Sequence, residues 1–152
     1  IPLYEQYERL KKNWKAIAAG IASGVLTSLV CVLVLSALLG LDHQMYVTLL
    51  PKSITSAIGM GVTEELGGVP TITVAVIIVT GILGAMVSDG LYKLLRITEP
   101  IAKGIGLGTS AHAMGTTKAL EMGEIEGAMS SLSIAVAGLL TVVGSSVFSM
   151  FY

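Results

Sequence analysis

Three long stretches of this sequence contain no charged side chain. They run from Ala16 to Leu41, from Val69 to Ser88 and from Gly127 to Tyr152. Each is as long as the roughly 20 apolar residues that a helix needs to cross a bilayer. Hydrophobic residues make up 53% of the chain and charged residues 12%, a composition unlike that of soluble domains. We therefore predict an all-α integral membrane protein with three full transmembrane helices, at about 16–41, 70–95 and 125–151.

A twelve-residue segment occurs twice between these stretches. Thr55 to Leu66 aligns without a gap with Thr109 to Leu120, and seven positions are identical. Each copy lies in a segment interrupted by glycine or proline, at about 44–68 and 99–122. Backbone freed from a helix at membrane depth must be buried in protein or line a cavity. The repeat therefore predicts two broken, re-entrant helical hairpins.

The lysines and arginines indicate how these segments are oriented. The basic segment 1–15 is expected on the cytoplasmic side, either as a loop or as a surface helix. If both hairpins re-enter, every lysine and arginine except Lys52 falls on or toward that side. If they cross the membrane instead, Lys93, Arg96 and Lys103 move to the other side. The positive-inside rule favours re-entry, in which case the hairpins enter from opposite leaflets as an inverted repeat suited to alternating access.

The predicted hairpin tips suit an anionic ligand. Helix N-termini present unpaired N–H groups and partial positive charge, threonine and serine add hydroxyl donors, and glycine lets a ligand approach the backbone. The candidate substrate-binding residues are Thr55, Ser56, Gly59, Gly61, Gly108, Thr109, Ser110, His112, Gly115 and Thr116.

One of these candidates can titrate near neutral pH. His112 replaces Ile58 of the first copy, and it could donate to a carboxylate or carry a coupled proton. The alternative is a structural histidine bonded to a backbone carbonyl. Lys52, Glu64 and Lys118 are candidate gating residues, and the alternative for them is ordinary helix-end charge.

Several function classes lack support in the sequence. We find no nucleophile and base at recognisable spacing, no phosphate loop, no metal-ligand cluster and no basic face for nucleic acid, so no enzyme activity, cofactor or metal is expected. The single Cys31 is expected to be a small packing residue. Asp89 is expected at the membrane interface, paired with Lys93 and Arg96.

Several motifs resemble the LrgB/CidB family. They are Leu50-Pro51-Lys52-Ser53-Ile54-Thr55, Glu64-Glu65-Leu66-Gly67-Gly68, Thr80-Gly81-Ile82-Leu83-Gly84, the segment Ala102 to His112, Gly115-Thr116 and Ala119-Leu120-Glu121. The resemblance runs from about Pro2 to the end of this chain. It covers the later two thirds of a typical family member. Two positions depart from the family pattern: Ala57 stands where proline is common, and Ser88-Asp89 where Gly-Pro is common. No family role is therefore assigned to Asp89.

The resemblance implies two functions. The first is a secondary transporter of small monocarboxylates such as glycolate, glycerate or pyruvate, driven by a coupled proton or sodium ion. The alternative is a holin-like or antiholin-like protein that regulates murein hydrolase activity and cell lysis with an LrgA/CidA-type partner. The expected location is the inner (plasma) membrane, or the chloroplast envelope if the source is a plant. The exact substrate, the coupling ion, a homodimer suggested by Gly20 and Gly24, and what precedes Ile1 stay open.

Overall fold

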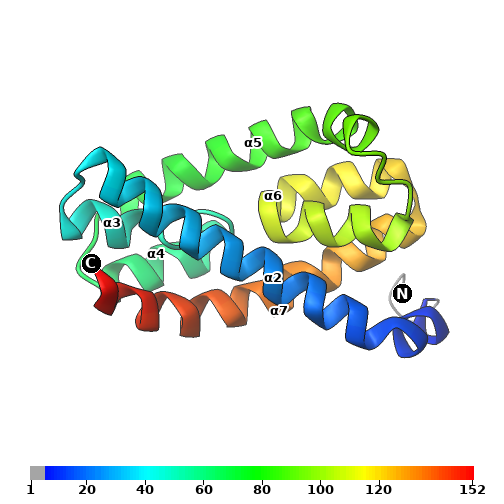
Figure 1. Ribbon diagram of the computed structural model, residues 1–152, viewed down its shortest axis with the longest axis horizontal. Helices are drawn as coiled ribbons and strands as arrows, with labels where there is room; N and C mark the ends of the chain where they lie inside the picture. The colour runs from blue at the N-terminus through cyan, green and yellow to red at the C-terminus, as the bar shows by residue number, and fades with distance from the viewer. Residues whose placement is uncertain (1–5) are drawn as a thin grey trace.

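The computed structural model describes residues 6–152, and within that range the ordered elements are helices (Figure 1). Residues 1–5 of the predicted basic segment lie outside the described residues. The helices are α2 (Tyr7–Leu39), α3 (His43–Leu49), α4 (Ser56–Glu65), α5 (Pro70–Leu94), α6 (Pro100–Met122), α7 (Glu124–Phe148) and the short 3₁₀ helix η1 (Ser149–Phe151).

Three of these helices are long and apolar enough to cross a membrane. The spans are Leu10–Leu39, Pro70–Leu94 and Glu124–Phe151. This confirms the prediction of an all-helical protein with three apolar helices of spanning length. The described part of the basic segment continues into α2, because residues 7–15 contain neither proline nor glycine to stop a helix. At its other end α2 stops at Gly40, whose φ of 64° allows the left-handed turn that caps a helix.

The long helices enclose the shorter elements. In Figure 1, α5 runs in the opposite direction to α2 and α7, and α6 folds back on itself at one end of the molecule while α3 and α4 lie at the other. The helix α6 packs against α7, α5 and α2, whereas α4 packs mainly against α5. The repeated segments therefore lie inside a frame of three long helices.

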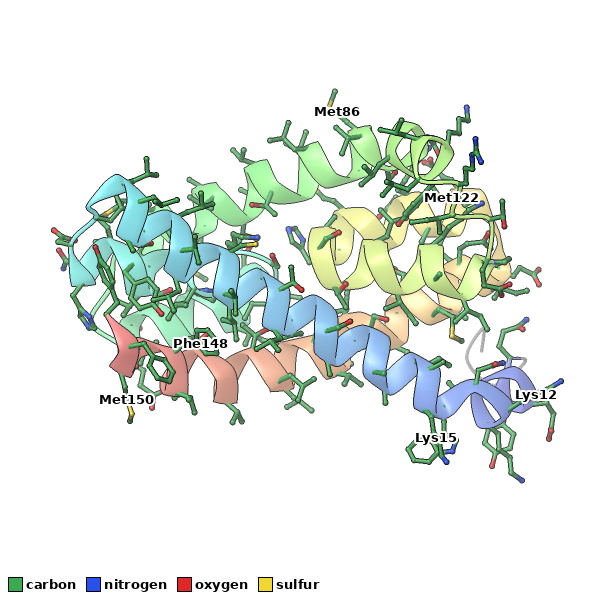
Figure 2. All side chains as sticks on the ribbon, viewed as in Figure 1. Lys12, Lys15, Met86, Met122, Phe148 and Met150 are labelled. Carbon is green, nitrogen blue, oxygen red and sulfur yellow. The ribbon has the colours of Figure 1, made fainter. Side chains whose placement is uncertain are left out.

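The long helices are apolar on both their inner and outer faces. On α2, Ile21, Val25 and Leu29 are buried at helical spacing, whereas Leu26 and Val30 on the opposite face are exposed. On α5, Met86 points outward and is 74% exposed (Figure 2). A helix that is apolar on all sides matches a lipid environment rather than water.

The positive charges lie mostly at one end of the molecule. Lys12 and Lys15 mark the beginning of α2 in Figure 2, and the end of α5, with Lys93, lies at the same end in Figure 1. Both ends of α6 are also there. Lys52 lies away from that end, in the turn between α3 and α4.

Candidate functional site

A proline breaks the helix just before the first copy of the repeat. α3 ends at Leu49, just before Pro51, and α4 begins at Ser56. Proline has no N–H to donate, and its ring clashes with the preceding helical turn. Thr55 is the N-cap of α4 in extended conformation (φ −68°, ψ 147°), and its side chain makes no capping hydrogen bond.

The second repeated segment breaks at a different place. Ile105 occupies the position equivalent to Pro51, so the helix continues to Ala111 and breaks only at His112, whose φ is 43° and ψ is −130°. The same Thr-Ser-Ala sequence therefore begins a helix in the first copy and ends a helical arm in the second. Thr109 and Ser110 donate to carbonyls of their own arm, at 2.8 Å to Ile105 O and 2.6 Å to Gly106 O.

His112 is buried and hydrogen-bonded to the backbone. One of its ring nitrogens, Nε2, lies 2.8 Å from the carbonyl oxygen of Ile77, and the residue is only 5% exposed. A Cβ atom at Gly81 would lie 2.5 Å from the ring atom Cε1, so the absence of a side chain at Gly81 makes room for the ring. This is the structural arrangement weighed above as the alternative to a ligand-binding histidine.

The two copies of the repeat meet at one residue of α5. A Cβ atom at Gly59 would lie 2.5 Å from Cδ1 of Ile77, whose carbonyl oxygen is the partner of His112. The first copy thus touches the side chain of Ile77 and the second its backbone. In Figure 1 α4 and α6 reach this region from opposite ends of the molecule.

The candidate glycines lie mostly in helix contacts. A Cβ atom at Gly108 would lie 2.5 Å from the carbonyl oxygen of Ser130 on α7, and one at Gly115 would lie 2.8 Å from Cβ of Ala111, within the folded α6. Gly61 is exposed, and no atom lies within 4 Å of the position that its Cβ would occupy. Gly59, Gly108 and Gly115 therefore allow close packing, and their contact with a ligand stays a prediction.

A cavity of about 700 Å³ lies between α2, the turn between α3 and α4, and the first arm of α6. The first tip contributes Lys52 and Ser53, and the first arm of α6 contributes Thr109 and Ser110. Its volume is within the range of ligand pockets. Its lining residues are Asn13, Ala16, Gly20, Ser23, Gly24, Thr27, Ser28, Cys31, Lys52, Ser53, Glu99, Ile101, Ala102, Ile105, Gly106, Thr109 and Ser110.

Some of the candidate residues lie elsewhere. Thr55, Ser56, His112 and Thr116 are not among the residues that line this cavity. Thr116 instead shares a 2.8 Å hydroxyl hydrogen bond with Ser130 of α7.

The cavity contains a polar cluster that sequence reasoning did not assemble. Lys52 Nζ donates to Ser53 Oγ at 2.9 Å, and Ser53 Oγ lies 3.1 Å from Ser28 Oγ on α2. Ser53 follows Lys52 directly, so the resemblance motif contained a signal for it. Nothing in the sequence indicated that Ser28 belongs to this cluster, because its contact with Ser53 depends on how α2 packs against the turn between α3 and α4.

The other candidate charges lie at the ends of the molecule. Lys118 Nζ lies 2.9 Å from Asp89 Oδ2 and 3.7 Å from Glu121 Oε2, and the hydrogen bond to the Asp89 carboxylate raises the pKa of Lys118. The expected pairing of Asp89 with Lys93 and Arg96 is therefore wrong in its partners. Lys118 reaches Asp89 because the second arm of α6 returns to the end of α5, which sequence spacing does not reveal. Glu64 is exposed near the end of α4.

The described residues contain no group of three or more histidine, cysteine, aspartate or glutamate side chains that could hold a metal ion. The cavity is lined by one lysine, Lys52, one glutamate, Glu99, and several hydroxyl groups, and its walls are α2, the turn between α3 and α4, and the first arm of α6. Such a cavity suits a small anion better than a metal ion.

Comparison with known proteins gives one consistent family match. The family model of the LrgB-like family matches residues 1–151. Curated relatives include the antiholin-like protein LrgB of Bacillus mycoides (strain KBAB4), of Bacillus cereus (strain B4264) and of Bacillus anthracis (strain CDC 684 / NRRL 3495). Each is 38% identical over 151 residues, which is 99% of this chain and 66% of the relative. No solved structure matches.

Proposed function

The chain belongs to the LrgB-like family, and we propose that it forms the substrate-binding part of a secondary transporter for small monocarboxylates. The observation that carries this proposal is the cavity to which both broken segments contribute, Lys52 and Ser53 from the first and Thr109 and Ser110 from the second. Paired broken helices around a central site are the arrangement that alternating access uses. The chain spans 66% of the length of the relatives, so the activity of the whole protein is part of the proposal.

In this proposal the two hairpins are re-entrant and form an inverted repeat. The offset that places Thr55 on Thr109 also places α5 on α7, from Pro70 on Glu124 to Leu94 on Phe148. These two helices run in opposite directions in Figure 1, as an inverted repeat requires. The different break positions in the two copies give each hairpin its own tip geometry.

The basic end of the molecule faces the cytoplasm in this proposal. The beginning of α2, the end of α5 and both ends of α6 lie at that end and carry lysines (Figure 1). The positive-inside rule favours this orientation in an inner or plasma membrane. The hairpin α3–α4 then enters from the outer leaflet and α6 from the inner leaflet.

The substrate class follows from charge and from the family resemblance. Lys52 and the hydroxyl groups of Ser28 and Ser53 favour a small anion in this cavity. The family resemblance implies that this anion is a monocarboxylate such as glycolate, glycerate or pyruvate. A proton or sodium gradient is the expected driving force.

Uptake by reconstituted full-length protein tests this function. Proteoliposomes should accumulate labelled glycolate or pyruvate with saturation, and unlabelled monocarboxylate should compete. Imposed proton and sodium gradients, applied separately, identify the coupling ion. Vesicles without protein are the control, and equal uptake by those vesicles would refute the transporter.

The names of the relatives favour a second function. They are called antiholin-like, so regulation of a lytic membrane pore, through a partner protein, is the alternative for this chain. The discriminating result is leakage: a protein that acts on a pore should change the release of large solutes from cells without saturable uptake by vesicles.

A further inference from the structure

Lys52 is a cation without an acidic partner in the part of the chain that the structure describes. The ion pairs found in residues 6–152 join Lys118 to Asp89 and Glu121, and none involves Lys52. Lys52 is partly buried, lines the cavity, and donates one hydrogen bond to Ser53 Oγ. A cation withdrawn from water is unfavourable unless it is paired, so an anion in the cavity would stabilise it.

The cluster around Lys52 has hydrogen-bond donors to spare. An ammonium group has three N–H donors, and one is used by Ser53. Ser28 and Ser53 share one hydrogen bond but have two hydroxyl protons. Two N–H donors and one O–H donor are therefore left for a ligand. A carboxylate has enough lone pairs to accept all of them, and charge-assisted hydrogen bonds of this kind are strong.

Lys52 and the one carboxylate of the cavity lie at different ends of it. The carboxylate lining the cavity is that of Glu99, an exposed residue at the N-cap of α6. Thr109 lies ten residues further along α6, which corresponds to about 15 Å of helix. On α2, the contact of Gly24 with Thr109 is followed one turn later by that of Ser28 with Ser53. Glu99 is therefore near one end of the cavity and Lys52 near the other.

We propose that Lys52, with Ser53 and Ser28, binds the carboxylate of the transported monocarboxylate. This inference rests on the proposed transport function and assigns its anion site to the first hairpin tip and α2, rather than to the helix N-termini or His112. The opposite wall, with Thr109 and Ser110, faces the remainder of the substrate.

Cys31 allows a labelling test that needs no engineered cysteine. It is exposed, it lines the same cavity, and it lies about one helical turn beyond Ser28. In the purified full-length protein, the rate of Cys31 modification by an anionic methanethiosulfonate reagent and by a cationic one can be followed by mass spectrometry of its peptide. Because Lys52 attracts anions, the anionic reagent should be favoured, on the order of tenfold at low salt after correction for intrinsic reactivity.

Two substitutions of lysine make the test specific. Lys52→Gln should abolish the preference for the anionic reagent and the protection of Cys31 by glycolate, whereas Lys93→Gln, an exposed lysine outside this cavity, should change neither. In uptake assays Lys52→Gln should raise KM at least tenfold, and Lys52→Arg should restore part of the loss because it keeps the charge. If Lys52→Gln does not fold, protection of Cys31 by glycolate in the unmodified protein still decides.

The outcomes distinguish this inference from the transport function. If the unmodified protein takes up glycolate but Lys52→Gln leaves KM and Cys31 labelling unchanged, the inference is overturned and the transporter stands. If Cys31 reacts with neither reagent in the full-length protein, the cavity is covered and the inference is also overturned. If the unmodified protein shows no uptake, the transport function fails, whatever the labelling shows.

Discussion

The contact between Gly81 and His112 gives the sharpest prediction about the second hairpin tip. In Gly81→Ala the new Cβ atom would lie 2.5 Å from Cε1 and 2.7 Å from Nε2 of His112, and 3.1 Å from Sδ of Met114. Favourable carbon contacts need about 3.5 Å or more, so the ring must shift by about 1 Å. That shift would lengthen the 2.8 Å contact between His112 Nε2 and Ile77 O beyond hydrogen-bonding distance.

Two effects add up in this variant. Overpacking of a close contact costs about 1–3 kcal/mol, and loss of the hydrogen bond costs about 0.5–1.5 kcal/mol. We therefore expect the free energy of unfolding to fall by about 1.5–4.5 kcal/mol, or roughly 10- to 2,000-fold in the folded-to-unfolded ratio.

A matched control lies on the same helix. At Gly90 of α5 no atom lies within 4 Å of the position that a Cβ would occupy, so Gly90→Ala meets no obstacle and should gain up to about 1 kcal/mol of helix propensity. Denaturant titration of both variants in detergent micelles measures the difference. Equal stability of Gly81→Ala and Gly90→Ala would refute the account of the His112 tip.

Three further predictions concern packing and charge. Thr73→Val should destabilise the protein by about 1–3 kcal/mol in the same titration, because its buried hydroxyl bonds to neighbouring groups, whereas exposed Thr71→Val should have little effect; equal effects would contradict this. Gly108→Ala should destabilise by at least about 1–3 kcal/mol, since the backbone of α7 that it meets cannot rotate away; an unchanged midpoint would contradict the close packing. Asp89 raises the pKa of Lys118, so the stabilisation from that pair is complete below the ordinary pKa of lysine and is lost as pH rises through the raised value. Lys118→Met should remove this alkaline loss of stability in thermal unfolding, and an identical pH profile would count against the pair.

The sequence predicted the long helices because their signal is local. A charge-free window of membrane-spanning length locates α5, and the predicted range 70–95 matches Pro70–Leu94 within a residue at each end, with Pro70 at its first turn. The beginning of α2 was placed too late, because the prediction used the absence of charge as the boundary. The charged residues before Ala16 are good helix formers and extend the helix to Tyr7.

The hairpin breaks were only partly predictable. Pro51 is a strong local signal, and the chain leaves α3 there. At His112 there is no such signal, since histidine is not a turn residue, and the break at φ 43° is accompanied by a hydrogen bond to α5 and a glycine beneath the ring. Alignment of the two copies therefore identifies equivalent residues without identifying equivalent conformations.

The candidate site depended most on tertiary packing. Sequence reasoning selected the repeated Thr-Ser-Ala residues for their type, whereas the cavity brings Lys52 and Ser53 together with Ser28 of α2. The contact between Ser28 and Ser53 joins residues 25 positions apart, and only the packing of α2 against the first tip creates it. The ion pair between Asp89 and Lys118 has the same origin.

The account depends most on the proposal that both hairpins re-enter the membrane. The most direct test is to find on which side of the membrane the residues that flank each hairpin lie. Single cysteines at Gln44 and Glu64 flank the first hairpin, and single cysteines at Thr98 and Glu124 flank the second; all four positions are exposed. In a Cys31→Ser background, a membrane-impermeant maleimide applied to intact cells should label Gln44→Cys and Glu64→Cys, whereas Thr98→Cys and Glu124→Cys should react only after the membrane is permeabilised. Labelling of the two flanks of either hairpin from opposite sides would show that the segment crosses the membrane, and would contradict paired re-entrant hairpins.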